Sequence, residues 1–142
     1  MSLLTLNAGS SSLKFALYQD DGSSPAPVFR LGGQVEGLGS EPRLQARQRG
    51  LTTPLADEPL ASQGAGAVRD VADAMRLVLD RLQDWLGGEP LAGVGHRVVH
   101  GGPHYSAPAL IDDAVLADLT RFVPLAPLHQ PHNLQGIRAA RE

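Results

Sequence analysis

The sequence predicts an α/β domain in which a mixed β-sheet is flanked by helices. Three observations indicate this class. Short apolar or alternating segments typical of strands occupy the first fifty residues, a long amphipathic helical pattern follows, and a glycine-bounded apolar segment then returns before two further helical patterns. The 142 residues suit one compact domain, large enough to bury a real core.

The first two predicted strands flank a polar hairpin in the stretch LTLNAGSSSLKFALY, residues 4–18. Residues 3–6 predict a short buried strand. After the hairpin, apolar Leu13, Phe15 and Leu17 alternate with other residues, so Ser12 and Lys14 share the opposite, polar face of the second strand.

The next segments are assigned from glycine and proline punctuation. Residues 20–26 predict a turn, residues 27–39 and 42–48 predict two more strands, and residues 50–63 predict a loop.

Residues 67–86 form the clearest predicted helix, because apolar residues recur at helical spacing and Gly87-Gly88 supplies a stop. Residues 91–102 predict a strand that ends at Gly101-Gly102. Asp112 is placed to cap a second helix that ends before Pro124.

The C-terminal stretch predicts a proline-rich loop over residues 123–133 and a third helix over residues 133–141. The chain stops inside this helix, which self-contained domains rarely do. We therefore interpret residues 1–142 as a fragment of a longer protein.

Composition excludes several classes of function. The net charge of −3 and the scattered Lys and Arg residues predict no basic patch for binding nucleic acid. No apolar stretch approaches the length of a membrane span. The N-terminus shows no signal-peptide pattern and the chain has no cysteine. These features predict a cytoplasmic protein without disulfides, thiol catalysis or cysteine metal sites.

The hairpin carries more polar chemistry than a turn requires. Small residues let the backbone approach a bulky anion, Ser10 and Ser12 add neutral donors, and Lys14 adds a positive charge. Asn7 offers an oxygen for Mg²⁺ or a hydroxyl and an amide for phosphate. No GxxxxGK[ST] P-loop is present, and the sequence leaves open both a phosphate site and a solvated Gly-Ser hairpin.

The segment GVGHRVVHGG carries a candidate carboxylate receptor. In an extended chain Arg97 and Val99 share one face, so the guanidinium can hold both oxygens of a short carboxylic acid while the valine lines its alkyl end. The alternative is an arginine in a structural salt bridge.

The histidines are interpreted from their local context. His96, His100 and His104 have the spacing of one helical face, but Gly101, Gly102 and Pro103 disfavour a helix there, so structural roles are preferred to a metal site. By contrast, His129 lies beside Leu128 in a loop stiffened by prolines, where an imidazole could donate to a phosphoryl oxygen.

Three stretches, LNAGSSSLKFALY, GHRVVHGG and APLHQPHNLQGI, resemble the successive N-terminal signatures of the acetate kinase family, in order and over essentially the whole chain. The resemblance implies the ribonuclease H-like, actin-like ATPase fold of the acetate and sugar kinase, Hsp70 and actin superfamily. It also implies reversible, Mg²⁺-dependent phosphoryl transfer between ATP and acetate, giving ADP and acetyl phosphate, in an enzyme that is typically a homodimer.

Carried onto this sequence, the resemblance implies roles for individual residues. Asn7 corresponds to a residue near the metal and the transferred phosphoryl group. Ser10, Ser12 and Lys14 resemble the phosphate contacts of the hairpin. Arg97 resembles the arginine that holds the acetate carboxylate, Val99 and Leu128 the walls of the methyl pocket, and His129 a histidine near the transfer centre.

The chain departs from the family in length. The adenosine-binding domain, the principal catalytic histidine and aspartate, a second arginine and a metal-binding glutamate are all missing. Three hypotheses therefore remain: the N-terminal part of an acetate kinase, the same part of a propionate kinase with a roomier pocket, or a non-catalytic module that binds an anion or a protein partner.

Overall fold

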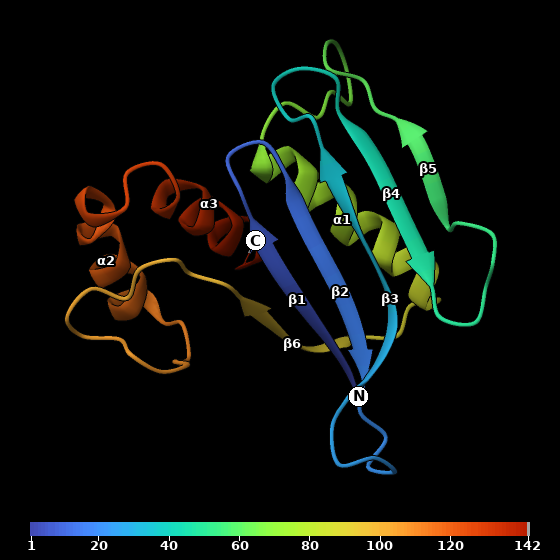
Figure 1. The fold of residues 1–142 in the computed structure, drawn as a ribbon, viewed down its shortest axis with the longest axis horizontal. Helices are drawn as coiled ribbons and strands as arrows, with labels where there is room; N and C mark the ends of the chain where they lie inside the picture. Colours follow the sequence, from blue (N-terminus) through green and yellow to red (C-terminus); the bar gives the residue numbers. More distant parts are fainter. Residues whose placement is uncertain (142) are drawn as a thin grey trace.

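The computed structural model describes residues 1–141, which form one six-stranded sheet with helices to one side and at one end (Figure 1). The strand order is β5-β4-β3-β2-β1-β6. The strands are β1 (Ser2–Ala8), β2 (Leu13–Gln19), β3 (Val28–Glu36), β4 (Arg43–Gln48), β5 (Ala56–Pro59) and β6 (Leu91–His96). All neighbours are antiparallel except β1 and β6, which are parallel, so the predicted mixed sheet is confirmed.

Two strand predictions are corrected. The stretch predicted as a loop over residues 50–63 contains β5, a four-residue edge strand paired with β4. The strand predicted to reach Gly101-Gly102 ends at His96, so Arg97 and Val99 lie in the loop that follows it. Both differences depend on which chain is available for pairing, which local sequence patterns do not encode.

The helices are α1 (Val71–Leu86), α2 (Asp113–Arg121) and α3 (Gln130–Arg141), with a short 3₁₀ turn at Val123–Leu125. The predicted cap of α2 is confirmed, because the Asp112 carboxylate accepts from the Val115 N–H at 2.8 Å. Helix α3 begins at Gln130, earlier than predicted, and includes Pro131. Proline is tolerated there because the N–H groups of a first helical turn have no partner within the helix.

The hydrophobic core lies between α1, α3 and one face of the sheet. Alternate residues of β1 and β2 point into it, including Leu4, Leu6, Leu13 and Leu17, all less than 5% exposed. Helix α1 packs behind the sheet with Met75 and its other apolar residues, and α3 lies beside α1 and β1 (Figure 1).

The opposite face of the sheet, which we call the open face, carries Thr5, Asn7, Lys14 and Ala16 of β1 and β2, together with outward-facing residues of β3 and β4. Among residues 1–141, no helix covers this face (Figure 1), and no helix is long and apolar enough to cross a membrane.

Candidate active site

A polar row crosses the open face at the hairpin end of the sheet. Asn7 lies opposite Lys14, Lys14 opposite Gln34, and Gln34 opposite Gln45. Residues opposite each other in adjacent strands project to the same side of a sheet. The strand register therefore places these four side chains together, away from the helices.

Arg97 joins this row across the parallel β1–β6 pair. His96 lies opposite buried Leu6 and follows it toward the helix-covered side, whereas the next residue, Arg97, projects with Asn7. The Arg97 N–H donates to the Leu6 carbonyl at 3.0 Å, which fixes the backbone from which the guanidinium extends.

A cavity of about 410 Å³ lies between these residues and is lined by Asn7, Lys14 and Arg97, with Thr5, Ala16 and Gly95. Two cations and one amide thus surround one hollow, although Arg97 is about eighty residues away from Lys14 in the sequence. Such a set of groups can neutralise and orient an anion.

The hairpin itself is a tight four-residue loop between β1 and β2. The Gly9 N–H donates to the Ser12 carbonyl at 2.8 Å, and a Cβ on Gly9 would lie 3.1 Å from the Ser12 Oγ. Ser10 is exposed and Ser12 is half-buried, and neither lines the cavity that Asn7, Lys14 and Arg97 share.

A second cavity of about 450 Å³ lies between the loop after β6 and α2. Its lining includes Arg97, Val99, Tyr105 and Leu119, so Arg97 borders both cavities. Within residues 1–141 Arg97 takes part in no ion pair, so the alternative of a structural salt bridge finds no partner there.

Leu128 and His129 occupy the turn immediately before α3, and both side chains are exposed. The His129 N–H donates to the Ala126 carbonyl at 3.2 Å. Neither residue lines the two cavities at Arg97, so in this part of the chain they stand apart from the Asn7–Lys14–Arg97 group.

The other histidines have separate structural surroundings. The His100 Nδ1 accepts from the Gly102 N–H at 2.8 Å, a local bond that agrees with the structural role expected for this residue. The His104 ring contacts the Tyr105 and Phe122 rings edge to face. Partial burial lowers the pKa of His96 below its usual range and favours the neutral imidazole.

Metal-binding side chains are not clustered in the described part of the chain. Within residues 1–141 no three His, Asp or Glu side chains are grouped closely enough to hold an ion, and Asn7 is the one amide among the cations of the site.

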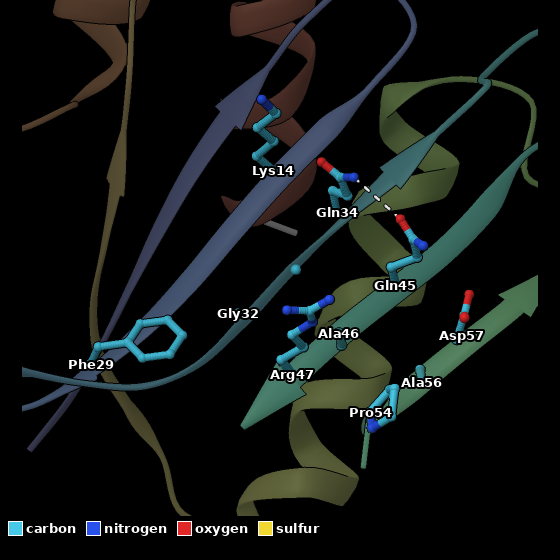
Figure 2. Close-up of a pocket in the computed structure, with 11 residues that line it drawn as sticks. Lys14, Phe29, Gly32, Gln34, Gln45, Ala46, Arg47, Pro54, Ala56 and Asp57 are labelled. Carbon is cyan, nitrogen blue, oxygen red and sulfur yellow. Dashed lines mark hydrogen bonds between the residues drawn. The ribbon is translucent and has the colours of Figure 1, made fainter. Parts of the chain in front are cut away.

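Sequence reasoning missed another cavity on the open face, about 460 Å³ in volume, which Lys14 also borders (Figure 2). Figure 2 shows Arg47 among the residues that line it and a dashed line between the Gln34 and Gln45 amides. The Gln34 Nε2 donates to the Gln45 Oε1 at 3.3 Å. Alternation in residues 42–48 could have placed Arg47 and Gln45 on one face.

Sequence reasoning also missed two buried amides in the first turn of α3, Gln130 and Asn133, which are 0% and 2% exposed. Gln130 donates to the carbonyls of His100 and Leu119 at 3.0 and 3.2 Å. The sequence does contain a signal for them: two amides three residues apart at the start of a helix lie on the same helix face.

The fold and the site define an α/β domain whose open sheet face gathers cations from distant segments around one hollow. The chain belongs to the acetokinase family, whose sequence model matches residues 2–142. It is 49% identical over 138 residues to an acetate kinase of Nitrobacter hamburgensis, covering 97% of this chain and 33% of that protein. It is 46% identical to an acetate kinase of Rhizobium meliloti, covering 99% and 34% respectively.

Solved structures agree with this assignment and confirm the predicted fold class. The acetate kinase of Porphyromonas gingivalis matches with a TM-score of 0.79 at 31% identity, covering 99% of this chain and 34% of that one. A propionate kinase of Francisella tularensis matches with a TM-score of 0.77 at 28% identity, covering 99% and 33%. The chain thus spans about a third of the length of these relatives.

Proposed function

We propose that this chain supplies the acceptor half, and part of the phosphate half, of an acetate kinase active site. The reaction is ATP plus acetate to ADP plus acetyl phosphate, reversible and by direct in-line transfer. The observation that carries the proposal is the meeting of Arg97 with Asn7 and Lys14 around one cavity on the open face. Membership of the acetokinase family supports the same reaction.

In this proposal Arg97 holds the acetate carboxylate. A guanidinium presents a planar fork of donors that matches two carboxylate oxygens, which a lysine ammonium cannot do. Arg97 is exposed and free of ion pairs within residues 1–141, so its donors are available to a ligand. Acetate is already ionised at neutral pH, so the attacking oxygen needs no general base.

The apolar end of the acceptor would contact Val99 and Leu128. Val99 is 46% exposed and Leu128 is 75% exposed, so both offer uncovered apolar surface. Val99 is two residues from Arg97 and lines the same second cavity. In the intact enzyme we place His129, the neighbour of Leu128, as a donor to the transferring phosphoryl group.

The phosphate side is assigned to the hairpin. Lys14 supplies positive charge beside the cavity, and the small residues of the loop let phosphate oxygens approach its backbone closely. Within the loop, the Gly9 N–H is already bonded to the Ser12 carbonyl. Ser10 and Ser12 would add hydroxyl donors from the same loop. Phosphoryl transfer depends mainly on positioning and on neutralising charge, and these groups serve both purposes.

Mg²⁺, bound with the nucleotide, would neutralise charge on the phosphates, and Asn7 is the residue of this chain that would contact it. The remaining ligands would come from the nucleotide and from the rest of the protein. From the family resemblance we further expect a cytoplasmic homodimer for the full-length enzyme.

The test uses the full-length product of the reading frame that contains this chain. Acetate-dependent conversion of ATP to ADP, with acetyl phosphate trapped as its hydroxamate, should be measured with and without Mg²⁺. A pure preparation that binds neither acetyl phosphate nor ATP in titration calorimetry and forms no acetyl phosphate would refute the proposal. Binding without turnover would instead identify an anion-binding module.

Residues 1–142 alone should show no turnover, because about two thirds of the length of the relatives is absent from them. The measurement is the same hydroxamate assay on this chain, with the full-length enzyme as the positive control. Turnover above background in a contaminant-free preparation would contradict the prediction.

The structural likeness to a propionate kinase keeps that acceptor as a second candidate. One methylene in a pocket changes binding by only about 1–3 kcal/mol, so the two acceptors differ modestly. The ratio of kcat/KM for acetate to kcat/KM for propionate, measured on the full-length enzyme, decides between them.

A further inference from the structure

Asn133 bridges the two segments that carry the candidate site. Its Nδ2 donates to the carbonyl of Ala8, the last residue of β1, at 2.8 Å. Its Oδ1 accepts from the N–H of Val99, two residues beyond Arg97, at 3.0 Å. The side chain is 2% exposed, and both of its polar atoms are satisfied by these bonds.

The position of this amide is significant because of the parallel register of β1 and β6. Arg97 N–H donates to Leu6 C=O, and a continued ladder would next join Val99 N–H to Ala8 C=O, two residues further along both chains. The Asn133 side chain forms hydrogen bonds with both of these groups, the Val99 N–H and the Ala8 carbonyl. Its amide thus occupies the place of the next ladder bond, and β6 ends at His96.

Two other residues of α3 also contact the segments that Asn133 bridges. Gln130, one turn earlier in α3, donates to the His100 carbonyl and ties the same loop to the helix. Gly136, one turn later, packs beside β1, where a Cβ would be at ordinary contact distance, 3.6 Å, from the Ala8 Cβ. The start of α3 is therefore fixed against both segments.

We propose that Asn133 is a positioning residue that acts as a spacer between the phosphate hairpin and the Arg97–Val99 segment. By replacing a direct ladder bond with an amide bridge, it ends the β1–β6 pairing beside Arg97. It thereby sets the separation between the residue that holds the carboxylate and the hairpin that faces the phosphates. The inference rests on the proposed function, because it needs both halves of the site.

The deciding measurement is the steady-state kinetics of Asn133→Ala in the full-length enzyme. Each half of the site keeps its own ligand contacts, so KM for acetate and for ATP should stay within about threefold. A misplacement of about 1 Å between reacting groups can cost up to about 100-fold in rate, so kcat should fall about 10- to 100-fold. A purely structural role would lower only the folded fraction.

The matched control is Ile137→Ala. Ile137 is in the same helix and 1% exposed, but its side chain makes none of the bonds to Ala8 or Val99. Its kcat per folded molecule should equal that of the wild type. Hydrogen exchange followed by mass spectrometry should show faster exchange of residues 97–102 in Asn133→Ala than in Ile137→Ala.

Asn133→Asp provides a nearly isosteric second variant in case Asn133→Ala fails to fold. It keeps the acceptor for the Val99 N–H but sets an oxygen against the Ala8 carbonyl, so kcat should again fall at least fivefold. Wild-type kcat in either folded variant overturns the inference. If the wild-type enzyme is inactive, the proposed function is refuted instead. The hydrogen-exchange measurement needs no activity, so it distinguishes failure of the proposed function from failure of the inference about Asn133.

Discussion

Replacement of Arg97 by alanine tests the proposed acceptor site most directly, because the structure separates the effect on stability from the effect on binding. The Arg97 side chain is exposed and makes no ion pair within residues 1–141. Its removal leaves no buried carboxylate without a partner. We therefore expect the free energy of unfolding to change by less than about 0.5 kcal/mol.

The expected functional loss is much larger. A hydrogen bond to a charged group contributes about 1.5–3 kcal/mol, and an arginine–carboxylate fork is of this kind. Loss of that interaction corresponds to about a 10- to 150-fold decrease in kcat/KM for acetate. The nucleotide phosphates are assigned to the hairpin, so KM for ATP should change by less than about threefold.

The assay measures initial rates on the full-length enzyme, with acetate varied at saturating Mg·ATP and ATP varied at saturating acetate. Urea unfolding of each variant measures stability. Arg47→Ala is the matched control, because Arg47 is an exposed cation of the open face that lines the cavity of Figure 2 and not the cavity at Arg97. Equal losses for acetate and ATP, or the same loss in Arg47→Ala, would refute the assigned role.

Two further predictions concern the fold. Gly33→Ala should lower the free energy of unfolding by about 1–3 kcal/mol, because the added Cβ would lie 2.0 Å from the Gln45 carbonyl oxygen. Gly93→Ala is the control and should cost far less, because its Cβ would lie 3.5 Å from the nearest side-chain atom. Equal urea midpoints for the two variants would contradict this prediction. Burial lowers the pKa of His96 in the folded protein. Below about pH 6.5 the unfolded state therefore binds more protons than the folded state, and the free energy of unfolding decreases as the pH is lowered from about 6.5. His96→Gln should flatten this part of the stability–pH profile, and an unchanged slope would remove His96 as its cause.

Local patterns in the sequence predicted most of the elements for a simple physical reason. Periods of two and of about 3.6 residues record which side of a strand or helix is buried, and α1 and β2 show these periods clearly. The cap at Asp112 followed from local chemistry as well. The edge strand β5 was missed because its four residues, Ala56–Pro59, carry no strong apolar alternation and depend on β4 for pairing.

The sequence by itself determined which residue types are available: a hydroxyl-rich hairpin, a forked cation and two amides at the start of a helix. Only the tertiary structure decided that Arg97 meets Asn7 and Lys14 on one sheet face, because this depends on the parallel pairing of β1 with β6. The tertiary structure also decided that β6 ends at His96, because the Asn133 side chain from α3 hydrogen-bonds the Val99 N–H and the Ala8 carbonyl in place of a bond between them. Hydrogen bonds between segments far apart along the chain fix such features, and no local periodicity records them.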